Sequence, residues 1–449
     1  MGGVSDYSGG LCLEWPTREA TFCALQLNDS GSLVVQSANA GRENWQPRFE
    51  VPLSQLLEMS LQQTREFFAQ ESSTRWASYI LGALPILRDA GYLTARRLEI
   101  LRGATLWISS DVPSGAGVSS SASVEVAAMQ AFCAALEISL DGIETARLCQ
   151  RVENAIAGAP CGIMDQMTVT LGQKDQLLQL LCQPHKVLPP VSLPPGVEIW
   201  GLDSHVKHSV GGTSYGRARC GAFMGRRVLR DLLPREMRGA SGELYLANIA
   251  PDIWRSVREL LPDQMRGSDF LARYDDHGDQ ATHIEADFEY SIRLATEHPI
   301  YERARVERFI AFLEAAKENP VSRFPLLCAA GDLMIQSHFS YEHRCNLGSS
   351  ETDFLVQLCR AAGTQSGVLG AKITGGGAGG TVAILCDRSR NLQIETVLRD
   401  IAEKYERHSG KTPYLFGGSS QGARKWGVRR TSVDKLSEIL SGLQTQASD

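Results

Sequence analysis

The feature that most constrains this chain is the stretch 111–129, DVPSGAGVSSSASVEVAAM, where two glycines and three consecutive serines join an apolar segment to a helical pattern. Gly115 and Gly117 can adopt positive φ and let a ligand approach the backbone. The serines fall where the first helical turn is expected, and a helix start offers unpaired N–H groups and partial positive charge. The stretch therefore predicts an anion cradle, with phosphate as the favoured ligand. An ordinary glycine-rich loop with a serine cap is the alternative.

Three common phosphate-binding motifs are absent from the sequence. The chain has no Walker A loop, and Ser120 stands where the dinucleotide fingerprint needs its third glycine. The set of motifs that marks protein kinases is also missing. If a nucleotide binds here, it binds to a different architecture.

Length and composition predict a two-domain cytoplasmic protein. A chain of 449 residues exceeds the usual size of one hydrophobic core. Five prolines between 184 and 196 place the boundary there, which predicts domains 1–190 and 191–449. A net charge of -6 argues against a nucleic-acid partner, and the arginines at 217–230 are interpreted as a solvated or ion-paired helix face.

The cysteines and the apolar runs indicate the cellular compartment in which the protein is expected. The eleven cysteines are scattered without close pairs, as expected for reduced thiols rather than a disulfide or zinc framework. No apolar run is long enough to cross a bilayer, and the start lacks a leader pattern, so neither a membrane nor an obligate protein partner is implied.

Two acids form the second candidate site. Glu153 lies near the end of an expected helix, and Asp165 follows twelve residues later, after a Gly-Pro-Gly turn that can fold it back toward the helix end. Beside phosphates, one acid would hold a divalent cation and the other would orient or deprotonate a nucleophile. A surface acid and an unrelated loop acid are the alternative.

The remaining pattern is that of an α/β protein with mixed strands and helices. Residues 21–27 and 32–36 alternate like paired strands around a turn at 28–31. Residues 373–380, ITGGGAGG, are expected to bring bare backbone close to another group, before a buried strand at 381–386. Further strands are expected at 11–13, 98–108 and 197–203, and helices at 61–90, 141–156, 223–233, 302–317, 325–338, 391–407 and 432–443, with an irregular excursion at 236–303.

Three segments in this order resemble the motifs of the GHMP small-molecule kinases: PSGAGVSSSAS at 113–123, ENAIAGAPCGIMDQ at 153–166, and ITGGGAGG at 373–380. Within that superfamily, CGIMDQ, HSVGGTSYGRAR and SHFSYEH resemble galactokinases. The DYSGG opening, VENAIAGAPCGIMDQM, RCGAFMGRRVL and HPIYERARV are most similar to the L-arabinokinase branch. The resemblance covers nearly the whole chain.

This resemblance implies a two-domain α/β fold of the α+β type, with the active site in the interdomain cleft. The implied reaction is ATP-dependent phosphorylation of the anomeric C1 hydroxyl of an aldose, with Mg²⁺. Ser121 and Glu153 would bind Mg²⁺, and Asp165 would accept the sugar proton. The implied ATP-binding residues are Pro113, Gly115, Ala116, Gly117, Val118, Ser119, Ser120, Ser121 and Ala122. The implied sugar-binding residues are Asp6, Tyr7, Gly162, Asp165 and Tyr215, and Gly375, Gly376 and Gly377 would lie near the transferred phosphate.

Two departures from the galactokinase pattern concern the start of the chain. Galactokinases carry GEHTDY where this chain has GGVSDY, so Gly3 and Val4 replace a Glu and a His placed against the sugar's hydroxymethyl group. L-Arabinopyranose lacks that group, so the change favours a pentose, with galactose as a poor substrate. Family members also carry an upstream strand and Arg. Here Met1 falls inside the motif, so either the chain starts at an internal Met or the enzyme works without that charge.

Three functional hypotheses follow. The leading one is an L-arabinokinase-like sugar 1-kinase. A galactokinase or another aldose 1-kinase is the nearer alternative. A galactokinase-like sugar sensor, which binds sugar and ATP without turnover, belongs to a different class, and the intact serine run with Glu153 and Asp165 favours catalysis over it.

Overall fold

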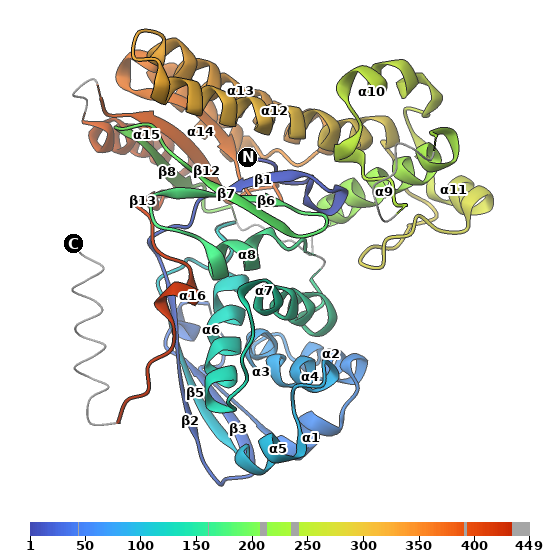
Figure 1. Ribbon diagram of the computed structural model, residues 1–449, viewed down its shortest axis with the longest axis vertical. Coiled ribbons are helices and arrows are strands. Elements are labelled where there is room, and N and C mark those ends of the chain that lie inside the picture. The colour runs from blue at the N-terminus through green and yellow to red at the C-terminus, as the bar shows by residue number, and fades with distance from the viewer. Residues whose placement is uncertain (44, 160, 207–212, 235–241, 390–392, 433–449) are drawn as a thin grey trace.

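A four-stranded sheet in the order β2-β5-β3-β4 lies in the lower half of the molecule in Figure 1, with helices beside it. The structure is a computed structural model that describes residues 1–43, 45–159, 161–206, 213–234, 242–389 and 393–432. Leu33 and Val35 on β3, with Leu106 on β5, are fully buried against the helices on one face of this sheet. The strands are β2 (Thr21–Leu27), β3 (Ser32–Ser37), β4 (Arg48–Pro52) and β5 (Ala104–Ser110).

The predicted strands at 21–27 and 32–36 exist, but the predicted pairing between them is wrong. β5 lies between them, antiparallel to β2 and parallel to β3. The amides of Asn28 and Gly31 in the connecting turn donate to the carbonyls of Gly103 and Arg102, the residues that lead into β5. The turn sequence at 28–31 depends only on neighbouring residues. It therefore could not indicate that a strand more than seventy positions later in the chain lies between β2 and β3.

The helices of this half follow the predicted pattern with two corrections. The predicted helix 61–90 is divided into several short helices. The predicted strand 98–108 begins only at Ala104, because residues 95–100 form a helix that Arg97 fixes through hydrogen bonds to the carbonyls of Tyr92, Leu136 and Glu137. The helices are α1 (Leu53–Glu58), α2 (Leu61–Ala69), α3 (Ser78–Leu81), α4 (Ala83–Asp89), α5 (Ala95–Ile100), α6 (Ser120–Ala135), α7 (Gly142–Arg151) and α8 (Met164–Leu171).

A three-stranded sheet of β1 (Leu11–Glu14), β6 (Gln176–Leu181) and β7 (Lys186–Ser192) lies between the two halves (Figure 1). Side chains alternate across a strand. Leu11 and Leu13 therefore pack on the long helices above, whereas Cys12 packs on Met164 and Met167 of α8 below. This sheet joins the halves, and the division into 1–190 and 191–449 stays a prediction.

The upper half contains a four-stranded sheet in the order β11-β12-β8-β13, with helices on both faces. Leu385 of β12 packs toward α12 and α13, and its neighbours Ile384 and Cys386 pack toward α14 and α15. The strands at 197–203 and 381–386 are confirmed, and both long helices extend beyond their predicted ends. The elements are β8 (Val197–Asp203), β11 (Val368–Ile373), β12 (Thr381–Asp387), β13 (Leu415–Gly417), α12 (Ile292–Glu318), α13 (Arg323–Cys345), α14 (Ser350–Ala362) and α15 (Ile394–Ser409).

The irregular excursion forms the lobe at the upper right of Figure 1. Its short elements confirm the prediction for the described residues up to 291, but residues 292–303 belong to the long helix α12, so the predicted end of the excursion is wrong. The helix predicted at 432–443 lies outside the described residues except for Ser432. The elements are α9 (Thr213–Leu232), α10 (Pro251–Val257), β9 (Met265–Arg266), α11 (Gly267–Tyr274) and β10 (Glu289–Tyr290), with α16 (Ala423–Trp426) closer to the C-terminus.

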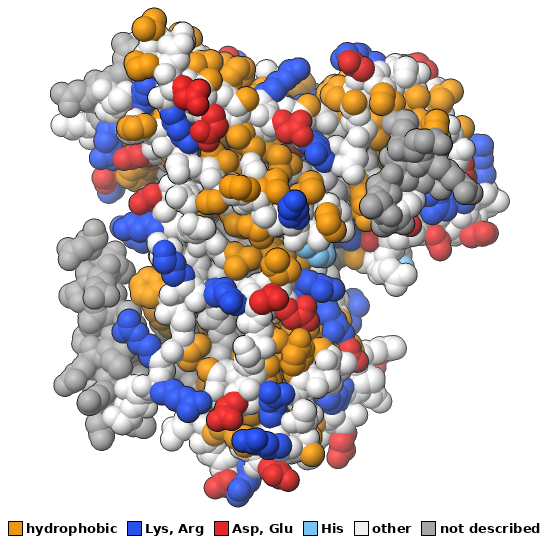
Figure 2. All heavy atoms as spheres, in the orientation of Figure 1, with side chains coloured by type: hydrophobic (Ala, Val, Ile, Leu, Met, Phe, Trp, Pro, Cys, Tyr) orange, Lys and Arg blue, Asp and Glu red, His pale blue; other side chains and the backbone are white. Residues whose placement is uncertain are grey.

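Two surface properties complete the description. Over the described atoms in Figure 2, acidic and basic side chains are interspersed and form no broad field of one sign. No helix in the described part of the chain combines the length and apolarity that crossing a membrane requires.

Candidate functional site

The predicted anion cradle is a loop that leads from β5 into α6. Gly115 and Gly117 have φ of 73° and 69°, and Ser119, which precedes the helix, has φ of 62°. The Ser119 side chain does not cap the helix. The N–H groups of the first turn of α6 therefore keep their capacity to bind an anion.

The glycine-rich loop 374–380 backs this cradle. Thr381 Oγ1 donates to the Ala116 carbonyl at 2.8 Å, and Thr374 Oγ1 donates to the Gly117 carbonyl at 3.3 Å. A Cβ at Gly380 would lie 2.9 Å from the Ala116 oxygen, so only glycine permits this approach. The predicted close backbone approach is confirmed, and the partner is the cradle itself.

The two predicted acids face the serines of the cradle. Glu153 lies in a π-helical turn that continues α7, and Asp165 lies in the first turn of α8. The Ser121 side chain opposes the rise in the pKa of Glu153, and the Ser119 side chain opposes the rise in the pKa of Asp165, so each serine lies beside one of the acids. The chain thus brings both acids to the start of α6, as the folded-back turn predicted.

The electrostatics of the acids follow from their burial. Burial raises the pKa of Glu153 to about 7, and the charge of Asp165 adds to the rise. Burial also raises the pKa of Asp165 to about 6. The charge of Asp6 adds to this rise, and the neighbouring Ser119 side chain opposes it. Crowded carboxylates of this kind are stabilised in their charged forms by a cation.

These residues fit Mg²⁺ bound together with phosphates. The described residues contain no cluster of three or more His, Cys, Asp or Glu side chains that could hold a metal alone. Mg²⁺ is commonly held by one or two carboxylates together with substrate phosphates and water. Glu153 and the Ser121 hydroxyl supply hard oxygen ligands beside the anion cradle, which matches that mode.

A third acid, Glu125 on α6, escaped the sequence analysis. It is 1% exposed, and the Gln166 amide nitrogen donates both to it at 3.2 Å and to Glu153 at 2.7 Å. Burial and the charge of Glu153 hold the pKa of Glu125 well above its usual range. Glu125 stands in the sequence among the buried residues Ala122, Val126 and Met129 of α6. This pattern could have indicated that Glu125 is buried as well.

The predicted sugar residues gather on another side of Asp165. Asp6 is 3% exposed, and its Oδ1 has no hydrogen-bond partner in the described structure. The Tyr7 and Tyr215 rings pack edge to face, with centroids 6.2 Å apart. Burial raises the pKa of Asp6, and the charge of Arg219 opposes this. A buried carboxylate oxygen without a donor is suited to accept a bond from a ligand hydroxyl.

Arg219 belongs to the arginines at 217–230, which are predicted to form a solvated or ion-paired helix face, and its ion pair confirms the second alternative for this residue. It is 7% exposed, and it makes two 2.8 Å hydrogen bonds to the Asp279 carboxylate. It is therefore a buried, ion-paired side chain behind Asp6 rather than part of a solvated face. The sequence alone could not show that Arg219 is buried, because its partner Asp279 comes from the excursion and only the fold brings the two together.

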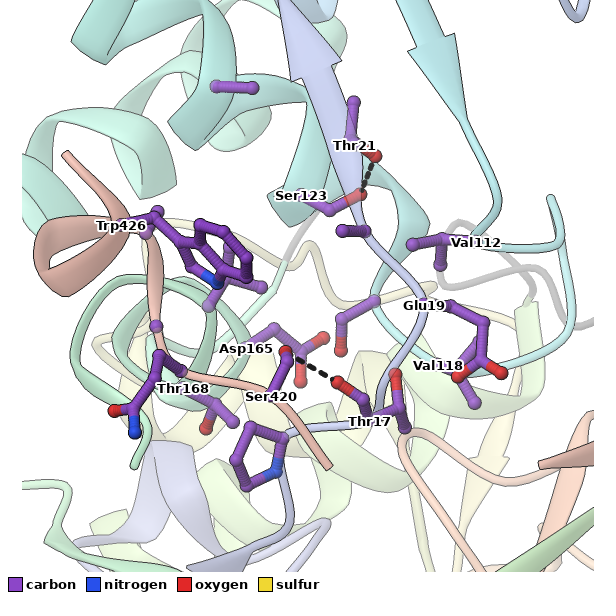
Figure 3. A pocket seen from close by; sticks show the side chains of 18 of the residues that line it. Thr17, Glu19, Thr21, Val112, Val118, Ser123, Asp165, Thr168, Ser420 and Trp426 are labelled. Atoms are coloured by element: carbon purple, nitrogen blue, oxygen red, sulfur yellow. Dashed lines mark hydrogen bonds between the residues drawn. The ribbon is translucent and has the colours of Figure 1, made fainter. Parts of the chain in front are cut away.

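A cavity of about 1100 Å³ reaches Asp165. Figure 3 shows Asp165 and Thr168 of α8, Val118 of the cradle and Ser123 of α6 on its wall. Gly375 of the glycine-rich loop also lines it, so residues from both predicted domains meet here. The predicted residues that line the cavity are Gly117, Val118, Ser119, Asp165 and Gly375; Asp6, Tyr7, Gly162 and Tyr215 are not in its wall.

Gly162 gives a direct test of the sugar side. A Cβ at this position would lie 1.4 Å from Asp6 Oδ2, so Gly162→Ala forces the Asp6 carboxylate to rotate away. We expect KM for sugar to rise by about tenfold or more because Asp6 is displaced, and Tm to fall as well because Asp6 is buried. Steady-state kinetics and thermal unfolding measure the two effects. An unchanged KM would remove Asp6 from the sugar site.

The arrangement and the comparisons agree on the class of protein. A helix-start anion cradle backed by a glycine-rich loop, between two α/β halves, is the GHMP kinase fold. The family models for the GHMP kinases N-terminal and C-terminal domains match residues 78–173 and 325–406. The chain belongs to the GHMP kinases.

Particular relatives are sugar kinases. The chain is 37% identical to an L-arabinokinase of Arabidopsis thaliana over 96% of its own length, and it spans 45% of that relative. It is 29% identical to a galactokinase of Roseiflexus sp. (strain RS-1) over 77% of this chain and 74% of the relative. In fold it is similar to Lactococcus lactis galactokinase, with a TM-score of 0.68, 20% identity, and 94% and 91% of the two chains covered. A mevalonate kinase is similar with a TM-score of 0.52, 13% identity, and 94% and 96% covered.

Proposed function

We propose that this protein transfers the γ-phosphoryl group of ATP to the anomeric C1 hydroxyl of an aldose, with L-arabinose as the preferred substrate. The observation that carries the proposal is the position of Asp165. It lines the same cavity as Ser119 of the anion cradle, and both Ser119 and Asp6 on the sugar side influence its pKa. A base at that point lies between a phosphate site and a hydroxyl site.

In this mechanism Asp165 accepts the proton of the C1 hydroxyl as the sugar oxygen bonds to the γ-phosphorus. The bond from that phosphorus to the β,γ-bridging oxygen breaks, and ADP leaves. The first turn of α6 and the glycine-rich loop hold the phosphates, and Asp6 and Tyr215 orient the sugar. Ser121 and Glu153 would hold Mg²⁺, which supplies charge neutralisation on the phosphates. Positioning and charge stabilisation provide most of the rate in such transfers.

The preference for a pentose rests on Gly3. A Cβ at this position would lie 2.0 Å from the Tyr341 hydroxyl oxygen and 3.0 Å from the Gly375 carbonyl oxygen. The Tyr341 hydroxyl donates to that carbonyl at 2.9 Å, so the contact is fixed. No side chain fits at position 3 in this arrangement, which supports a sugar without a hydroxymethyl group to bond. The identity to L-arabinokinase supports the same choice.

The cysteines support a cytoplasmic setting for this activity. None of the eleven forms a disulfide, although the sulfurs of Cys12 and Cys182 lie 3.5 Å apart. Two thiols that stay reduced at such a distance are typical of a reducing compartment.

The pH dependence of turnover tests the base. Because Asp165 must be charged to accept a proton and burial raises its pKa to about 6, kcat/KM is expected to fall as the pH drops through about 6 and to be full above it. Measuring kcat/KM for sugar from about pH 5 to about pH 8 at saturating Mg-ATP shows this fall on the acid side of the profile. A profile flat down to about pH 5 would mean that Asp165 is not the base.

A further inference from the structure

Glu302 on α12 is a fully buried acid that touches the start of the chain. It is 0% exposed, and its Oε1 accepts from the Gly2 amide at 3.0 Å and from the Ser337 hydroxyl at 2.6 Å. Its Oε2 accepts from Arg305 Nε at 2.9 Å. Burial alone would raise the pKa of Glu302, but the charge of Arg305, with a contribution from Lys372, brings it below its usual range. The carboxylate is therefore charged, and the Gly2 amide is one of its donors.

His298 holds the next peptide group of the same segment. It lies four residues before Glu302, so the two side chains share one face of α12. Its Nε2 lies 3.1 Å from the Gly3 carbonyl, and its Nδ1 lies 2.9 Å from the Ser340 hydroxyl. Burial lowers the pKa of His298 to about 4, so the ring is neutral. A neutral ring that donates from Nε2 to Gly3 accepts from Ser340 at Nδ1, which satisfies both nitrogens.

A hydrogen-bonded turn connects Gly2, which Glu302 holds, to Asp6. The Ser5 hydroxyl donates to the Gly2 carbonyl at 2.6 Å, and the Gly10 amide donates to the Ser5 carbonyl at 2.9 Å. The Gly9 amide closes the turn on the Asp6 carbonyl at 3.2 Å. A displacement of Gly2 and Gly3 is thus transmitted to the Asp6 carboxylate within a few residues.

We infer that Glu302 and His298 are positioning residues for the sugar site. They fix the peptide groups of Gly2 and Gly3, and so fix Asp6 against Gly162 and Asp165. The inference rests on the proposed function insofar as Asp6 binds the sugar. Burying a charge is costly unless its partners are well placed. At Glu302 one of those partners is the backbone that leads to the sugar site.

The same helix supplies a matched control. Glu297 is also buried, at 6% exposed, and it is paired with Arg344 at 2.9 Å and with the Trp254 indole at 3.1 Å. None of these contacts involves residues 1–10. Glu297→Gln therefore removes a comparable buried charge without touching the sugar turn, and it reports the purely structural part of the effect.

The test compares Glu302→Gln with Glu297→Gln in the full chain. For Glu302→Gln we expect KM for sugar to rise roughly 10- to 100-fold, while KM for Mg-ATP changes less than about twofold. Hydrogen exchange of the amides at 2–8 should accelerate. Glu297→Gln should lower Tm without either change. At His298, Gln keeps a donor that can reach Gly3, so His298→Gln should retain more sugar affinity than His298→Asn.

The outcomes separate the inference from the proposed function. If both glutamate variants lower Tm alike, with equal sugar KM and equal exchange at 2–8, Glu302 is only structural and the inference is overturned. Faster exchange at 2–8 in Glu302→Gln alone supports the attachment even if no aldose is turned over. In that case the proposed function fails by the wild-type assay, and the part of the inference that concerns the sugar fails with it.

Discussion

Replacing Asp165 with Asn is expected to lower kcat by about 10²-fold or more, while sugar and ATP still bind. The amide has nearly the same shape, so the packing around position 165 is kept, but the amide cannot accept the proton of the C1 hydroxyl. Initial rates of ADP release measure kcat, and calorimetry measures binding.

Asp175→Asn is the control for this change. Asp175 lies ten positions further along, and its carboxylate accepts from the Ser419 hydroxyl at 2.9 Å, outside the cluster of acids. We expect its kcat to equal that of the wild type. If Asp165→Asn and Asp175→Asn were equally active, the sugar proton would have to leave by another route.

Glu153→Gln is expected to raise the Mg²⁺ concentration for half-maximal activity by about tenfold or more and to lower kcat at any fixed Mg²⁺. The variant removes the carboxylate that faces Ser121 and keeps a side chain of the same size. Titration of activity with MgCl₂ at fixed ATP measures the shift, and Mn²⁺ offers a second cation for the same titration.

A second glutamate serves as the control for the predicted effect of Glu153→Gln on the Mg²⁺ requirement. Glu144→Gln alters a partly exposed acid nearer the start of α7, away from the cluster of acids, and should leave the Mg²⁺ requirement unchanged. An unchanged requirement in Glu153→Gln would show that Glu153 is not a ligand. Glu125, which shares the Gln166 amide with Glu153, would then be the next carboxylate to examine.

The local features of the site could be predicted from the sequence because they lie in short segments. Glycines followed by serines specify the loop and the start of α6, and the spacing from Glu153 to Asp165 specifies a folded-back turn. The strand that precedes the cradle was found in the same way, although its first six predicted residues belong to α5 and its connecting loop.

The remaining features depend on contacts between distant segments. A typical turn sequence connects β2 and β3, yet β5 lies between these two strands in the sheet. Arg219 belongs to a run of arginines with a surface-like pattern, and only Asp279 makes it a buried group. Glu302 binds Gly2 across three hundred positions. Each of these facts requires knowing which elements pack together, which a pattern within one segment does not contain.

The most direct test of the central claim is ADP release at fixed Mg-ATP with L-arabinose, D-galactose, D-glucuronate and L-fucose. Phosphorus NMR of the product identifies the phosphorylated carbon. We expect the highest kcat/KM with L-arabinose, a slower reaction with D-galactose, a sugar 1-phosphate as product, and loss of turnover in Asp165→Asn. Sugar and ATP binding by calorimetry without turnover on any of the four sugars would contradict the claim and would identify the chain as a non-catalytic sugar sensor.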